Sequence, residues 1–165
     1  MTTAPTPPAD VLVVGTGLVG TSVALALTAA GSRVFLADVD AANAEYAAAL
    51  GAGSAAPPES RVDLCVLAVP PGAVAGTLRG LQERDAAAVY TDVASIKTRP
   101  HEEARQTGCD LRSYVGGHPM AGRERSGPAA ARMDLFVGRP WVLTPSAEST
   151  TGAVAAVRAL AHTCG

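Results

Sequence analysis

The chain has 165 residues, a length that predicts one domain of ordinary size rather than two. Hydrophobic residues make up 48% of it, its formal net charge is −2 and its pI is about 5.9, so we expect a packed core and no binding of nucleic acid. No apolar run is long enough to span a bilayer, the N-terminus lacks the features of a signal peptide, and the three cysteines form no Cys-x-x-Cys pair. These features predict a cytoplasmic protein with no membrane segment, no disulfide framework and no metal site.

Strand-like and helix-like segments alternate along the chain after a Pro-rich tail, residues 1–9, that we predict to be disordered. Strands are predicted over residues 11–14, 33–37, 53–56, 63–69, 87–91, 112–115 and 141–144. Helices are predicted over residues 18–30, 41–50, 72–82, 100–106 and 151–162. This alternation predicts an α/β fold, a doubly wound parallel sheet over residues 10–165. Because a closing helix normally leads into another strand, we expect the fold to be truncated before its last strand.

A glycine-rich turn follows the first strand and opens the first helix. Its residues form a G-x-G-x-x-G pattern: Gly15, Thr16, Gly17, Leu18, Val19 and Gly20. Such a turn in a Rossmann-type domain binds the pyrophosphate of a dinucleotide, with one glycine for the tight turn, one for close approach of the ligand and one for helix packing. The free N–H groups at the helix N-terminus add to the attraction for phosphate. The alternative is a glycine-rich turn in an α/β domain that binds no nucleotide.

The residue that ends the second strand predicts which dinucleotide is bound. Asp38 lies 18 residues after Gly20 and can accept hydrogen bonds from the ribose hydroxyls of NAD. Its carboxylate would repel the 2′-phosphate of NADP, and residues 39–45 contain no Arg or Lys to bind that phosphate. The sequence therefore predicts NAD as the cofactor.

Two further segments follow predicted strands, at the sheet edge where open α/β domains bind ligands. The first is Asp92-Val93-Ala94-Ser95-Ile96-Lys97, and the second is Gly116-Gly117-His118-Pro119-Met120-Ala121-Gly122. Pro119 holds His118 in an extended conformation on a loop, and an imidazole can accept a proton near neutral pH. His118 is therefore the candidate general base. His101 and His162 lack this setting and are interpreted as structural.

These motifs, together with Ala68-Val69-Pro70-Pro71, resemble those of the prephenate dehydrogenase family, which includes arogenate-using relatives. The resemblance covers about residues 10–165 and implies an NAD-binding domain followed by a helical dimerisation domain that this chain lacks. It implies oxidative decarboxylation of prephenate to 4-hydroxyphenylpyruvate in tyrosine biosynthesis, by a parent enzyme that is a homodimer. His118 would deprotonate the ring hydroxyl, Ser95 would hydrogen-bond near it and Glu124 would help to shape the substrate pocket. We expect the 165-residue chain alone to be inactive.

The sequence is compatible with more than one role for several of these residues. Ser95 also suits a loop or capping role, and Val69 and Pro70 form either a wall beside the cofactor or a simple strand end. Lys97, the single lysine of the chain, is a solvated or helix-packing charge or a catalytic group. The alternative functions are arogenate dehydrogenase, another NAD(P) oxidoreductase of this architecture, and a non-catalytic nucleotide-binding module.

Overall fold

The computed structural model of the chain describes residues 6–121 and 126–165. Six strands form one sheet in the order β2-β1-β3-β4-β5-β6. Their bounds are Asp10–Val14 (β1), Arg33–Ala37 (β2), Val62–Leu67 (β3), Ala87–Asp92 (β4), Tyr114–Pro119 (β5) and Trp141–Thr144 (β6). The strands β1 to β5 pair in parallel, so their carboxyl ends share one edge of the sheet. At that edge the order reverses between β1 and β3, which is where a doubly wound sheet opens a crevice.

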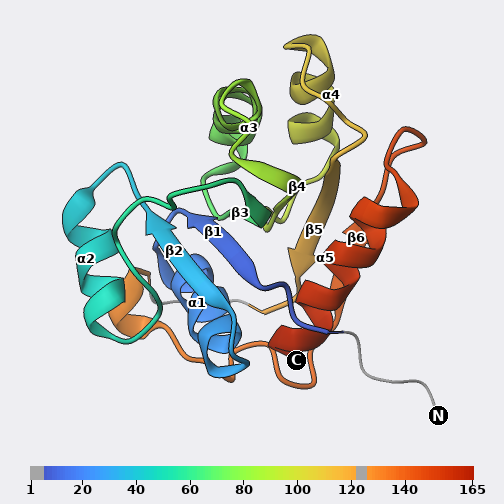
Figure 1. The fold of residues 1–165 in the computed structure, drawn as a ribbon. Helices are drawn as coiled ribbons and strands as arrows, with labels where there is room; N and C mark the ends of the chain where they lie inside the picture. Colours follow the sequence, from blue (N-terminus) through green and yellow to red (C-terminus); the bar gives the residue numbers. More distant parts are fainter. Residues whose placement is uncertain (1–5, 122–125) are drawn as a thin grey trace.

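Helices cover both faces of this sheet (Figure 1). They are α1 (Leu18–Ala29), α2 (Ala41–Ala49), α3 (Val74–Glu83), α4 (Thr98–Gln106) and α5 (Thr151–Cys164), with short 3₁₀ helices η1 (Pro71–Ala73) and η2 (Pro128–Ala130). α1 and α5 pack on one face, where Val11 and Val13 of β1 are fully buried. α3 and α4 pack on the other, with Leu12 of β1. Burial on both faces explains why the strands are continuous apolar runs, and the predicted α/β Rossmann-type fold is confirmed.

The prediction of an all-parallel sheet is wrong for β6, which pairs antiparallel with β5. The connection between them begins and ends at the same sheet edge, since the Met120 amide donates to the Pro140 carbonyl at 2.8 Å. A parallel strand needs a crossover that returns the chain to the opposite edge. Among the described residues of this connection only η2 is helical, and it makes no such crossover.

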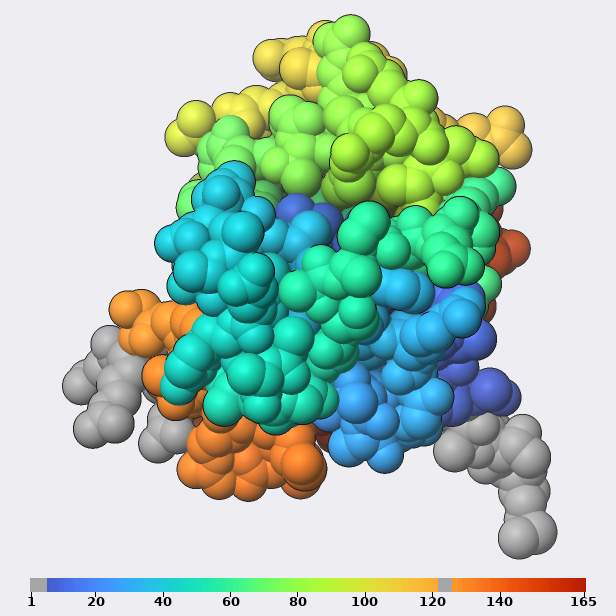
Figure 2. All heavy atoms as spheres, turned by 60° about the vertical axis from the view of Figure 1, so that its left-hand side comes forward, coloured from blue at the N-terminus to red at the C-terminus, as the bar shows by residue number. Residues whose placement is uncertain are grey.

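The strand predicted over residues 53–56 is reduced to one bridge between Phe35 and Ser54. Two hydrogen bonds join Ser54 to β2: the Leu36 amide donates to the Ser54 carbonyl, and the Ser54 amide donates to the Val34 carbonyl. Pro57 and Pro58 follow, and because proline has no N–H the pairing cannot continue. Figure 2 shows the side of the molecule on which α2 and the loop after it lie, with α3 above them.

β5 differs from its predicted bounds of 112–115 and continues to Pro119. It passes through Gly116 and Gly117 because both are paired across to β6, with Thr144 and Leu143 respectively. His118 therefore lies within a strand, opposite Val142, and not on a loop as predicted.

The folded part of the chain begins earlier than the predicted boundary at residue 10. The Ser32 hydroxyl donates to the Pro8 carbonyl at 2.7 Å, and the Ala9 amide donates to the Asp63 carboxylate at 3.2 Å. Both residues are thus held against the sheet. Across the described part of the chain, no helix is long and apolar enough to cross a membrane.

Candidate functional site

The glycine turn after β1 is shaped by two glycines that no other residue could replace without movement. Gly15 has φ +95°, and a Cβ there would lie 2.2 Å from the Ala68 carbonyl oxygen. A Cβ on Gly20 would lie 1.9 Å from the Gly15 carbonyl oxygen. A Cβ on Gly17, by contrast, would meet nothing within 4 Å. The first and last glycines therefore close the turn against β3, while Gly17 faces open space.

The N-terminus of α1 is open to a ligand. Gly17 is its N-cap, and within residues 6–121 and 126–165 no side chain caps the first-turn amides. The first N–H groups of a helix have no partner within the helix, and the helix dipole adds positive potential at this end. The turn is thus suited to an anionic group such as a phosphate.

Asp38 is tied directly to the turn. Its Oδ2 accepts hydrogen bonds from the Thr16 amide at 2.7 Å and from the Thr16 hydroxyl at 2.8 Å, while Oδ1 accepts from the Asp40 amide at 3.0 Å. Burial by itself would raise the pKa of Asp38, but these hydrogen bonds outweigh it and hold the pKa below its usual value. The group is a carboxylate at neutral pH, placed at the end of β2.

Two cavities of about 370 Å³ each lie on either side of the Ala68-Val69-Pro70 segment. One is lined by Gly15, Asp38 and Val39 together with Ala73 and Thr77. The other is lined by residues of the first turn of α1 and by the segment after β4: Leu18, Val19, Gly20, Val93 and Ala94. Gly17 borders both cavities, as do Val69 and Pro70. Of the predicted cofactor-binding residues, Thr16 and Ser95 line neither cavity, while the others border one or both of these adjoining cavities, which form the crevice beside the glycine turn.

Ser95 follows β4 and His118 lies near the end of β5, so the two residues lie at the ends of adjacent strands, as predicted. Ser95 is exposed on the segment after β4, and His118 is half-buried on the part of β5 that projects past the end of β4. Among the described residues, no hydrogen bond joins these two side chains. Glu124, with Arg123 and Arg125, lies outside the described residues.

A buried ionic cluster lies beneath this pair. Asp92, the last residue of β4, is fully buried, and its carboxylate is paired with the ammonium of Lys97. The same carboxylate accepts a hydrogen bond from the Tyr114 hydroxyl at 2.8 Å. The Lys97 ammonium also donates to the Gly117 carbonyl at 2.5 Å. Lys97 is thus neither a solvated charge nor a helix-packing one.

Sequence reasoning missed Asp92 and Tyr114 as members of the site. Burial lowers the pKa of Lys97, and its pairing with Asp92 opposes that effect. Burial and the neighbouring Asp92 carboxylate raise the pKa of Tyr114. The signal that could have revealed the cluster is a single lysine in an arginine-rich chain, five residues after an aspartate at the end of a buried strand.

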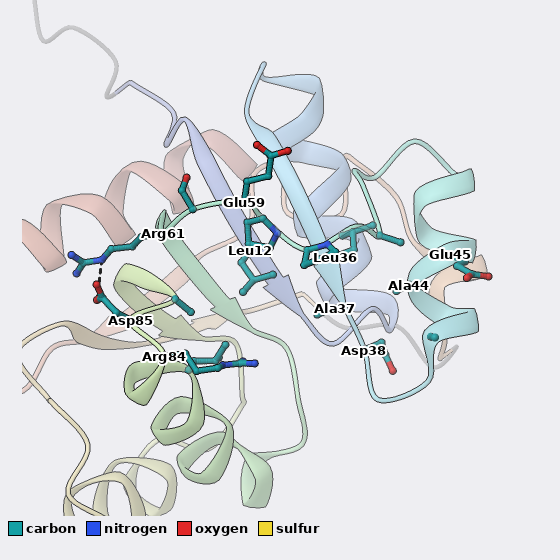
Figure 3. Close-up of a pocket in the computed structure, with 17 residues that line it drawn as sticks. Leu12, Leu36, Ala37, Asp38, Ala44, Glu45, Glu59, Arg61, Arg84 and Asp85 are labelled. Atoms are coloured by element: carbon teal, nitrogen blue, oxygen red, sulfur yellow. Dashed lines mark ion pairs between the residues drawn. The ribbon is translucent and has the colours of Figure 1, made fainter.

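A further cavity of about 620 Å³ shares Ala37 and Asp38 with the cavity beside Gly15. Figure 3 shows it between β2, the loop after α2 and the end of α3, with Glu59, Arg61, Arg84 and Asp85 around its mouth. Arg61 and Asp85 form an ion pair at 3.1 Å. Asp38 reaches its edge, but Ser95 and His118 are not among its lining residues.

The remaining histidines, His101 and His162, lie on α4 and α5. The His101 ring stacks on Tyr114 with centroids 6.5 Å apart, and His162 is exposed on α5. The three cysteines are free thiols. No group of three or more His, Cys, Asp or Glu that could hold a metal ion occurs in residues 6–121 and 126–165.

Residues 23–165 match the model of a family described as prephenate dehydrogenase, nucleotide-binding domain. The chain belongs to this family. It is 44% identical over 154 residues to NovF of Streptomyces niveus, a probable prephenate dehydrogenase; the aligned region covers 93% of the chain and 42% of NovF. The chain therefore spans less than half of the length of that relative.

Solved structures of the prephenate dehydrogenase family share the fold. A prephenate dehydrogenase from A. aeolicus, in complex with hydroxyphenyl propionate and NAD⁺, superposes with a TM-score of 0.82 at 25% identity, covering 95% of the chain and 57% of that protein. A Synechocystis arogenate dehydrogenase superposes with a TM-score of 0.83 at 30% identity, covering 94% and 57%. The resemblance drawn from the sequence motifs is thereby confirmed.

Proposed function

We propose that the chain is the NAD-binding part of a prephenate dehydrogenase, which converts prephenate and NAD⁺ into 4-hydroxyphenylpyruvate, CO₂ and NADH. The observation that carries the proposal is the arrangement of Ser95 and His118 at the carboxyl ends of adjacent strands, beside the glycine-turn crevice, in a member of this family. A proton acceptor and a dinucleotide crevice at one sheet edge are what oxidation of a ring alcohol requires.

The residues of the crevice fit NAD⁺. Gly17 leaves room for the pyrophosphate beside the uncapped N-terminus of α1, and Asp38 is ionised where a ribose hydroxyl would donate to it. No cation lies in residues 39–45 to neutralise a 2′-phosphate. The neighbour from A. aeolicus was solved with NAD⁺, which supports this choice of cofactor. Bound NAD⁺ would supply the hydride acceptor.

His118 is the proposed general base and Ser95 its hydrogen-bonding companion. Neutral imidazole would take the proton of the substrate hydroxyl, so that the oxygen electron pair can form a C=O bond as the same carbon gives up hydride, and it would return this proton to the phenolate oxygen once the ring is aromatic. Loss of the ring carboxylate as CO₂ then makes the ring aromatic. Val69 and Pro70 would form the apolar wall beside the cofactor.

The substrate needs charged partners in addition to Ser95 and His118. Prephenate carries two carboxylates, and we propose that cations on a following helical domain bind them and that this domain forms a homodimer. Glu124, which follows the His118 segment in the sequence, is the proposed contribution of this chain to the pocket. The covered share of the family members, 42% of NovF and 57% of the A. aeolicus enzyme, leaves room for such a domain.

Arogenate is the second candidate substrate, favoured by the similarity to the Synechocystis arogenate dehydrogenase. It differs from prephenate in carrying an amine in place of the side-chain ketone, remote from the ring hydroxyl on which His118 would act. The same base and the same cofactor site would therefore serve either substrate.

A domain exchange tests the proposal. The matching part of NovF is replaced by this chain, and NADH formation is followed with NAD⁺ and either prephenate or arogenate. We expect oxidation of at least one of the two substrates, and its loss when His118→Asn is introduced into the exchanged part. A folded exchange protein that binds NAD⁺ but oxidises neither substrate would contradict the proposed function.

A further inference from the structure

The Asp92 carboxylate connects the two segments that bear the proposed site residues. Its Oδ2 accepts a hydrogen bond from the Ala94 amide at 3.0 Å, directly before Ser95. Its Oδ1 faces the Gly117 amide at 3.4 Å, directly before His118, and accepts from the Tyr114 hydroxyl on the same strand. One buried side chain therefore holds both segments at the sheet edge.

Lys97 completes this connection from the other direction. Its ammonium is bound to Asp92 and donates to the Gly117 carbonyl at 2.5 Å. The amide and the carbonyl of Gly117 are thus held by the two members of one ion pair. Because the next residue takes its direction from this peptide group, the ion pair sets the orientation of the His118 backbone.

The glycines of β5 leave the space that this arrangement needs. A Cβ on Gly116 would lie 2.5 Å from the Thr144 hydroxyl and 3.5 Å from Cδ of Lys97. A Cβ on Gly117 would lie 2.8 Å from the Asp92 carbonyl oxygen. The lysine stem therefore lies across a strand that carries no side chain at this point, close to His118.

Burial of this ion pair is poorly explained by stability alone. The Lys97 side chain is 18% exposed and that of Asp92 is fully buried. Removing two charges from water costs several kcal/mol per ion, and apolar replacements of such pairs are often neutral or stabilising. An ion pair that holds a functional site in its productive geometry contributes to function even where it adds nothing to stability.

We infer that Lys97 and Asp92 are positioning residues, which hold Ser95 and His118 in their relative places for the reaction proposed above. The inference rests on that proposed function for its purpose, and on the hydrogen bonds of Gly117 and Ala94 for its geometry. The other titratable groups around Lys97 are Tyr114 on β5 and His101 and Glu102 on α4, which line the same cavity of about 310 Å³. Neither Lys97 nor Asp92 is assigned a step on the substrate.

NMR spectroscopy of the 165-residue chain tests the inference without requiring turnover. In Lys97→Ala we expect the amide signals of Ser95 and Gly117 and the imidazole signals of His118 to move. The imidazole of His162, exposed on α5, serves as the internal reference. Exchange of the Gly117 amide with solvent should become at least tenfold faster. Arg99→Ala, which removes an exposed ion pair with Glu103, is the matched control and should leave these signals in place.

Rescue separates positioning from mere structural support. The cavity beside Lys97 admits a small amine, so ethylammonium should return the signals of Lys97→Ala toward those of the wild type, whereas tetramethylammonium, which has no N–H, should not. Lys97→Arg, which keeps the charge and the donors, should retain the wild-type signals. If Lys97→Ala fails to fold, the comparison of Lys97→Arg with Lys97→Gln gives the same test.

A variant that is less stable but keeps the Ser95, Gly117 and His118 signals of the wild type would overturn the inference. A parallel titration with NAD⁺ distinguishes this failure from that of the proposed function. If the wild-type chain does not bind NAD⁺ but the His118 signals still depend on Lys97, the proposed function fails and the positioning stands. If NAD⁺ binds and the signals are indifferent to Lys97, the positioning fails alone.

Discussion

Asp38 links the end of β2 to the glycine turn and is the proposed determinant of the dinucleotide preference. It accepts two hydrogen bonds from Thr16 and one from the Asp40 amide, and still borders the cavity beside Gly15. We expect NAD⁺ to bind at least tenfold more tightly than NADP⁺, which corresponds to about 1.4 kcal/mol. Calorimetric titrations with both dinucleotides measure this ratio. Asp38→Ser should bring the two affinities closer together, and equal affinities in the wild type would contradict the role of Asp38.

The same carboxylate predicts an acid-dependent contribution to stability. Because the pKa of Asp38 is lowered in the folded state, its ionised form stabilises the fold above its ordinary value of 3.8, and this stabilisation is lost as the pH falls through the lower folded-state value. Asp38→Asn should therefore be less stable than the wild type at pH 6, and the difference should shrink below about pH 3.8. Urea unfolding at a series of pH values measures it, and a constant difference down to pH 2.5 would argue against the prediction.

His118 carries the proposed proton transfer. In the domain-exchange enzyme, His118→Asn should leave NAD⁺ affinity nearly unchanged and lower turnover by roughly 10²–10⁴, the usual value of a positioned base. Titration with NAD⁺ and steady-state kinetics of the two proteins measure these effects. Normal turnover in the variant would remove His118 from the mechanism.

At the scale of elements, the glycine turn offers three substitutions with different outcomes. Gly20→Ala would place a Cβ 1.9 Å from the Gly15 carbonyl oxygen, so we expect destabilisation by about 1–3 kcal/mol or more, as in overpacked cores. Gly17→Ala meets nothing within 4 Å and has an ordinary negative φ, so stability should be unchanged or slightly higher while NAD⁺ affinity falls. Gly31→Ala, at a helix end far from the turn and with φ +94°, is the control that lowers stability alone. Thermal melts and NAD⁺ titrations distinguish these outcomes, and a Gly17→Ala protein with wild-type affinity would contradict the assignment of the turn.

The elements that the sequence predicted best are those whose local signals agree with their burial. The sequence predicts β1 and α1 correctly because a continuous apolar run, a glycine turn and a helix-forming segment all indicate the same structure. Asp38 was placed correctly because it ends a short, strongly patterned strand. The three-dimensional neighbours of these elements follow from right-handed crossovers.

The elements that the sequence predicted poorly depend on partners that are remote in the chain. β5 runs through two glycines because β6 and the Asp92–Lys97 pair hold it, and local propensity disfavours glycine in a strand. β6 runs antiparallel to β5, and the hydrogen bond from the Met120 amide to the Pro140 carbonyl joins the two strands where the connection begins and ends. No periodicity in the sequence indicates this contact. The buried cluster was missed for the same reason, since Asp92, Lys97 and Gly117 become neighbours only when the sheet has formed.

At the scale of the whole molecule, the chain covers 42% of NovF and 57% of the A. aeolicus enzyme. The cations for the two substrate carboxylates are proposed to come from a domain in the remaining part. We therefore expect the 165-residue chain to oxidise prephenate far more slowly than a typical enzyme, whose turnover is about 10 s⁻¹. Misplacement of a substrate by about 1 Å costs on the order of 10²-fold in rate, and an open crevice admits water. NADH formation with saturating prephenate is the assay, and turnover within about tenfold of that value would contradict the prediction.

The proposed function depends on a dinucleotide that lies across the glycine turn with its nicotinamide end beside Ser95 and His118. A pair of NMR titrations of the chain tests this placement, one with NAD⁺ and one with ADP-ribose, which lacks the nicotinamide ring. We expect both ligands to move the amide signals of Gly17 and Asp38, and only NAD⁺ to move those of Ser95 and His118. Binding of NAD⁺ that leaves Ser95 and His118 unchanged, or that bypasses the turn, would contradict it.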